Sequence, residues 1–61
     1  MFRHTEEAEV IDQEGDTIAL FHDLQDAKAS AGIANRLLRE GNDPEEVELR
    51  IRTWAEGDCY V

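Results

Sequence analysis

The chain has 61 residues, of which 15 are Asp or Glu and 6 are Lys or Arg, so its formal net charge is -9. A domain of this size buries only about 60% of the surface that its unfolded chain exposes, which leaves room for one minimal core. The negative charge argues against direct binding to nucleic acid or to anionic lipid, because both repel an acidic surface.

Cys59 is the only cysteine, so no disulfide can form within the chain. The sequence also has no apolar run typical of a signal peptide or of a membrane-spanning helix, and it shows no cluster of metal ligands. These features predict a cytoplasmic protein, in the host cytoplasm if a phage encodes it, with no cofactor and no membrane partner. Small folds gain stability from disulfides, metals or oligomerisation, and oligomerisation is the supplement left to this chain.

Residues 2–12 and 16–22 are expected to form two strands of a β-hairpin, because they flank a turn-rich segment. A three-residue loop, residues 13–15, sets Val10 against Ile18 and gathers the apolar side chains on one face. The same register sets Ala8 against Leu20. Gly15 suits the left-handed conformation that the last position of such a loop requires.

A helix is expected over residues 24–40, with Asp23 as its N-cap and Gly41 as a left-handed C-cap before Pro44. Apolar residues at three- and four-residue steps predict the stripe that packs on the sheet. They are Leu24, Ala27, Ala31, Ala34 and Leu38.

Residues 46–54 contain a strict alternation of apolar and charged residues, which predicts a half-buried strand with Val47, Leu49 and Ile51 facing the helix. Residues 58–61 form an optional edge strand. The expected fold is therefore α+β of ββαβ(β) order, a single domain in which one helix packs on one face of a three- to four-stranded sheet.

In this arrangement the uncovered sheet face displays apolar and aromatic side chains, and the outer face of the helix carries two more apolar residues. Exposed aromatic clusters on small proteins often mark interfaces. Trp54 belongs either to this surface or, through a bulge near Thr53, to the core, and both alternatives remain open at this point. The predicted oligomer interface comprises Ile11, Phe21, Ile33, Leu37 and Trp54.

The acidity is concentrated in one part of the chain. Eight of the 15 acids lie between His4 and Ala27, a segment without Lys or Arg. Such a segment attracts basic protein surfaces, and a row of carboxylates can mimic the phosphates of a nucleic acid. The alternative is that the acids only keep a small protein soluble or adapt it to salt. The predicted partner-binding residues are Glu6, Glu7, Glu9, Asp12, Glu14 and Asp16.

No catalytic site is predicted, because the chain offers only one Cys, one Ser, three Thr and two His from which to build a nucleophile and its base. A metal or pH-sensing pair of His4 and His22 is conceivable, but two surface histidines are the expected interpretation. The acidic turn does not fit a calcium-binding EF-hand loop, since Thr17 and Asp23 stand where Gly and Glu are required.

The segment from Val10 to Phe21, followed by Asp26-Ala27 and a helix that reaches Asn35, resembles a pattern of short uncharacterised bacteriophage and actinobacterial proteins. The resemblance implies a phage or prophage origin. The function expected is a non-enzymatic acidic module that binds a host protein, as an inhibitor or modulator, by nucleic-acid charge mimicry. The alternative is a structural or assembly homodimer that buries its aromatic sheet face.

Overall fold

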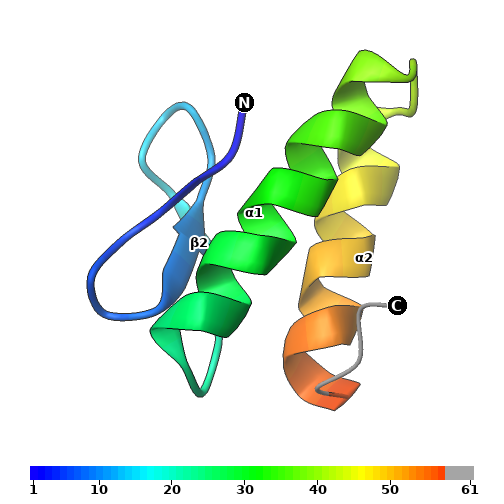
Figure 1. Cartoon of the computed structure of the whole chain (residues 1–61). Helices are drawn as coiled ribbons and strands as arrows, with labels where there is room; N and C mark the ends of the chain where they lie inside the picture. Colours follow the sequence, from blue (N-terminus) through cyan, green and yellow to red (C-terminus); the bar gives the residue numbers. More distant parts are fainter. Residues whose placement is uncertain (58–61) are drawn as a thin grey trace.

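The computed structural model describes residues 1–57, which form an antiparallel three-stranded sheet and two helices (Figure 1). The α+β class is confirmed, but the ββαβ(β) order with a single helix is wrong, because the chain runs βββαα. The predicted strand at 58–61 lies outside the described residues. The elements are β1 (Arg3–His4), β2 (Glu9–Ile11), β3 (Thr17–Leu20), α1 (Leu24–Arg39) and α2 (Pro44–Gly57).

The segment predicted as one strand, residues 2–12, is two short strands joined by a turn. β1 pairs antiparallel with β2, with Arg3 opposite Ile11 and His4 opposite Val10. The chain reverses at residues 5–8, where Ala8 adopts a left-handed φ of 64°. A continuous strand fails here because Glu6-Glu7 interrupts the alternation of apolar and polar residues that a half-buried strand needs.

The β2–β3 turn forms as expected, and its register then slips by one residue. Gly15 has a φ of 91°, and the N–H of Asp12 donates to the carbonyl of Asp16 at 3.0 Å. Beyond the turn a bulge intervenes, so that Val10 pairs with Ala19. The expected pairs of Val10 with Ile18 and of Ala8 with Leu20 are therefore wrong.

The bulge decides which side chains of β3 reach the core. An extra residue in one strand reverses the inward and outward alternation beyond it. Leu20, expected in the core, is consequently 64% exposed, and Phe21, expected on the open face, is only 8% exposed. The N–H of Phe21 donates to the carbonyl of Ala8 at 2.9 Å, which continues the shifted register.

Helix α1 begins and ends where its capping residues indicate. The Asp23 carboxylate accepts from the N–H of Gln25 at 3.1 Å, and Gly41 adopts a φ of 97° beyond the last turn. The face turned to the core is made of small residues, which lets the helix lie close to its neighbours. The buried residues are Ala27, Ser30, Ala31 and Ala34, whereas Leu24 is exposed and Leu38 is half-buried.

Helix α2 replaces the strand predicted at 46–54. Pro44 occupies its first position, where a missing N–H costs nothing, and the Asp43 carboxylate caps it by accepting from the N–H of Glu45 at 3.0 Å. Val47 and Ile51, four residues apart, are 0% exposed, while Leu49 between them is 59% exposed. The buried positions of this segment follow the helical spacing of four residues. The strand predicted from the alternation of apolar and charged residues is therefore wrong.

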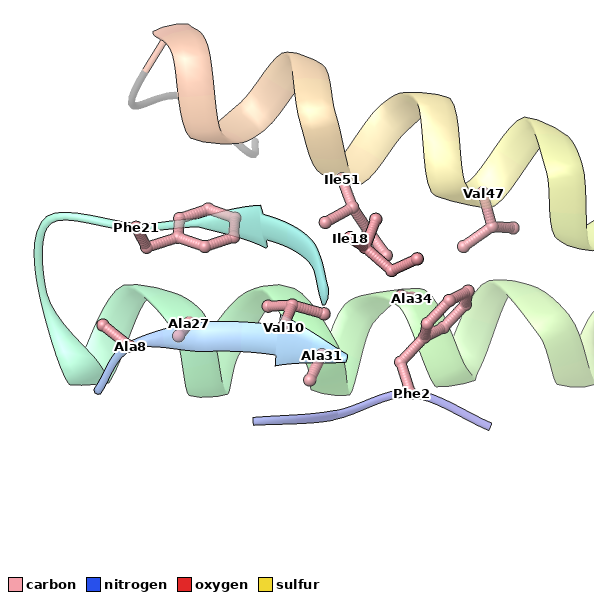
Figure 2. Close-up of a cluster of buried hydrophobic side chains, with 10 residues drawn as sticks. All are labelled: Phe2, Ala8, Val10, Ile18, Phe21, Ala27, Ala31, Ala34, Val47 and Ile51. Carbon is pink, nitrogen blue, oxygen red and sulfur yellow. The ribbon is translucent and has the colours of Figure 1, made fainter. Parts of the chain in front are cut away.

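One core lies between the sheet and the helix pair (Figure 2). Helix α1 packs against β1 and β2, and α2 packs against β3 and α1. Figure 2 shows Ile51 of α2 next to Ile18 of β3, with the ring of Phe2 directed toward α1. The buried apolar residues are Phe2, Ala8, Val10, Ile18, Phe21, Ala27, Ala31, Ala34, Val47 and Ile51.

Asn35 ties the N-terminal segment to α1 with a pair of hydrogen bonds. Its Oδ1 accepts from the N–H of Phe2 at 2.7 Å, and its Nδ2 donates to the carbonyl of Phe2 at 3.0 Å. The side-chain amide thus makes the two contacts that a neighbouring strand would make at this sheet edge. The backbone N–H and carbonyl of Phe2 are thereby satisfied, and the Phe2 ring is held in the core.

The core contains one polar group that lacks a partner among the described residues, the Ser30 hydroxyl, which is completely buried. An unsatisfied buried hydroxyl is unfavourable, and alanine has a higher helix propensity than serine. We expect Ser30→Ala to raise the free energy of unfolding by about 1 kcal/mol, measured by urea denaturation. Destabilisation instead would mean that the hydroxyl is hydrogen-bonded in solution.

Candidate functional site

The first acidic turn, residues 5–8, projects Glu6 and Glu7 into solvent. The Thr5 hydroxyl accepts from the N–H groups of Glu7 and Glu9, each at 3.3 Å, and the Thr5 N–H donates to the Glu9 carbonyl at 2.9 Å. The buried Ala8 side chain closes the turn from the core side. Both Glu6 and Glu7 are exposed, and neither carboxylate has a hydrogen-bond partner within residues 1–57.

The second acidic turn, residues 12–16, is organised by one of its own carboxylates. Oδ1 of Asp12 accepts from the N–H groups of Glu14 and Asp16, each at 2.9 Å. The Gly15 N–H donates to the Asp12 carbonyl at 3.1 Å. Asp12 is therefore needed to form the turn, while the exposed Glu14 and Asp16 remain available for external contacts.

Five of the six predicted partner-binding residues are thus distributed over two turns at opposite ends of β2 (Figure 1). Glu9 lies on the strand between the turns, half-buried, and its Oε1 accepts from the Thr17 hydroxyl at 3.3 Å. The fold does not bring all six together in one row. Four carboxylates are exposed, in two pairs: Glu6 with Glu7, and Glu14 with Asp16.

The five residues predicted as an oligomer interface do not share one exposed face. Phe21 belongs to the buried core, because the bulge turns it inward, so the predicted aromatic sheet face is wrong. Trp54 lies on α2, half-buried, and packs against the same core. Ile11 on β2 and Ile33 and Leu37 on α1 are half-buried.

The structure shows an apolar groove that the sequence interpretation missed. It lies between β3 and α2, and two exposed leucines line it, Leu20 and Leu49. The hairpin register predicts Leu20 in the core, and the strand alternation predicts Leu49 there, so both predictions are wrong. Reading residues 44–57 with a helical period, starting from Pro44, would have placed Leu49 opposite Val47 and Ile51.

Other kinds of site find little support. Within residues 1–57 no group of three His, Cys, Asp or Glu side chains is arranged to hold a metal ion. His4 is exposed on β1, and His22 is exposed in the loop before α1. In the same part of the chain, neither helix combines the length and apolarity needed to cross a membrane.

Comparison of the chain with models of protein families, with curated proteins and with solved structures found no match.

Proposed function

We propose that this chain is a non-enzymatic module that binds a protein with a basic surface through its two acidic turns. The observation that carries the proposal is the pair of ordered turns that expose Glu6, Glu7, Glu14 and Asp16 in a segment without Lys or Arg. Hydrogen bonds to the Thr5 and Asp12 side chains order the backbone of both turns, so less backbone entropy is lost on binding than for a disordered acidic tail.

The partner chemistry follows from the spacing of the charges. Two pairs of carboxylates, separated by the length of β2, fit two basic clusters on one protein surface better than a continuous nucleic-acid groove. In this proposal each acidic turn mimics one cluster of phosphates, and the two turns together do not mimic a continuous nucleic-acid backbone. The resemblance to bacteriophage proteins makes a host protein the expected partner, which the module would inhibit or modulate.

The proposal is tested with two variants that have the same net charge. The turn variant changes Glu6, Glu7 and Glu14 to Gln, and the control changes three exposed glutamates outside the turns, Glu40, Glu46 and Glu56, to Gln. Proteins retained from a host lysate by immobilised wild-type chain are identified, and their affinities are then measured individually. Each exposed ion pair contributes about 0.2–1 kcal/mol, so the turn variant is expected to bind roughly tenfold more weakly than the control.

Salt provides the second criterion. Attraction between exposed charges is screened over about 10 Å at 0.1 M ionic strength and over about 3 Å at 1 M, so a charge-driven partner must dissociate as salt rises. Equal weakening by both variants would show that only the net charge matters, which is the solubility alternative. An affinity that does not depend on salt would contradict the acidic-turn proposal.

A further inference from the structure

Two of the four large apolar side chains that are exposed within residues 1–57 meet in one place. These four are Met1, Leu20, Leu24 and Leu49. Leu20 and Leu49 line the groove between β3 and α2, together with Arg52 and Thr53. A second shallow depression shares Leu49 and Arg52 and extends the surface to Glu45 and Glu48. The apolar patch is therefore continuous with a charged strip along α2.

The charges on this strip follow a simple order. With about 100° between successive helical residues, Glu45, Leu49 and Arg52 fall on the side of α2 opposite the buried Val47 and Ile51. Glu45 and Glu48 come before Leu49 and Arg52 comes after it, while Glu56, which also lines the groove, lies one turn beyond Arg52. Arg52 forms no ion pair within residues 1–57, and its Nε donates to the Ile18 carbonyl at 3.4 Å, which holds the side chain over the groove.

When two copies of α2 lie antiparallel, this order of charges brings the arginine of each helix to the acids of the other. If a second α2 runs antiparallel across the first, with the two Leu49 side chains at the two-fold axis, Arg52 comes level with position 46 of the second copy. It then lies between Glu45 and Glu48 of that copy, and the same contact occurs a second time by symmetry. We propose that two copies of this chain associate through the α2–β3 groove in this antiparallel arrangement, burying Leu20 and Leu49.

The charge distribution favours a second copy over a basic or an acidic partner at this surface. The residues that line the groove include one arginine and one glutamate, Arg52 and Glu56, whose charges cancel. The acid-rich segment contributes to the groove only the uncharged Ala19 and Leu20. The groove itself therefore adds no net charge to the contact, and the acids beside it, Glu45 and Glu48, are the groups that face Arg52 of the second copy. With two leucines per copy the interface is small, and a dissociation constant in roughly the micromolar range is expected.

The first test is the oligomeric state of the full chain by sedimentation velocity, with a reductant present so that Cys59 does not cross-link. The wild type is expected to shift from monomer to dimer between roughly 1 and 500 µM. Leu49→Glu is expected to weaken association at least tenfold. Leu24→Glu is the matched control, because it places the same charge on an exposed leucine outside the groove, and it is expected to dimerise as the wild type does.

The second test addresses the orientation by exchanging charges. In a homodimer of the Arg52→Glu variant, the new carboxylate lies against Glu45 and Glu48 of the other copy. In a homodimer of the Glu45→Arg/Glu48→Arg variant, the new guanidinium groups lie against Arg52 of the other copy. Each variant alone is therefore expected to associate at least tenfold more weakly. A mixture of the two restores every opposite-charge contact and is expected to form a heterodimer of near wild-type affinity. The double variant leaves the hydrogen bond between Arg52 and Ile18 intact, so its result does not depend on that contact.

A wild type that stays monomeric throughout the concentration range would overturn the proposal, as would equal effects of Leu49→Glu and Leu24→Glu. A mixture no tighter than either charge variant alone would overturn the antiparallel arrangement. The dimer does not rest on the acidic turns, because neither Glu6, Glu7 nor Glu14 is changed in any of these variants. Failure of one proposal therefore leaves the other intact.

Discussion

Replacing Ile51 by Ala is expected to lower the free energy of unfolding by about 2–5 kcal/mol. The side chain is completely buried between α2 and β3, next to Ile18, and its loss leaves a cavity in the centre of the core (Figure 2). A domain of 61 residues has a total stability of only about 3–9 kcal/mol, so the variant will be at best marginally folded at 25 °C. Urea denaturation followed by circular dichroism measures the loss.

Leu49→Ala is the matched control for this experiment. In a strand over residues 46–54, Leu49 and Ile51 would share one buried face and both substitutions would be costly. In helix α2, Leu49 is 59% exposed, so its truncation should change the stability of the monomer by less than about 0.5 kcal/mol. If the two substitutions cost the same, α2 is not the structure of this segment. Ile51→Val, with an expected cost of about 0.5–1.5 kcal/mol, remains measurable if Ile51→Ala does not fold.

Replacing Asn35 by Ala should cost about 2–3 kcal/mol, because it removes two hydrogen bonds and leaves the part-buried N–H and carbonyl of Phe2 without partners. The loss releases the N-terminal segment from α1 and lets the Phe2 ring leave the core. Urea denaturation gives the total cost, and hydrogen exchange should show protection lost first at Phe2. Arg39→Ala, an exposed substitution four residues later on the same helix, should be nearly neutral.

Asn35→Asp separates the two hydrogen bonds. The carboxylate can still accept from the N–H of Phe2 but cannot donate to its carbonyl, so this variant should also be destabilised despite its similar shape. A wild-type stability for Asn35→Ala would mean that the N-terminal segment is not held to α1 in solution.

If both proposals are correct, the dimer carries two copies of the acidic turns and is a bivalent module. Pairing through α2 leaves the acidic turns of both copies unoccupied, since none of their carboxylates lines the groove. Two linked binding sites raise the apparent affinity for a partner with repeated basic clusters without any new contact. The monomeric Leu49→Glu variant would then retain the affinity of a single module and lose the avidity of the pair.

The sequence by itself determined the features that depend on neighbouring residues. Asp23 and Gly41 delimit α1 because a cap acts through hydrogen bonds and dihedral angles within one turn. Gly15 marks the hairpin turn because few other residues adopt its φ of 91°. The acidic character of residues 4–27 is likewise a property of the sequence. Its division into two presented turns depends on the Thr5 and Asp12 hydrogen bonds, which composition does not reveal.

Only the tertiary structure decided the features that depend on which face is buried. As a strand, residues 46–52 would bury Val47, Leu49 and Ile51 on one face, and as a helix they bury only Val47 and Ile51. The packing of α2 against β3 and α1 selects the helix. The bulge after Val10 is equally invisible in the sequence, yet it exchanges the positions of Leu20 and Phe21. Both outcomes leave a leucine on the surface, Leu20 on β3 and Leu49 on α2. The two leucines that line the groove between β3 and α2 are therefore placed there by the bulge and by the helical structure of α2.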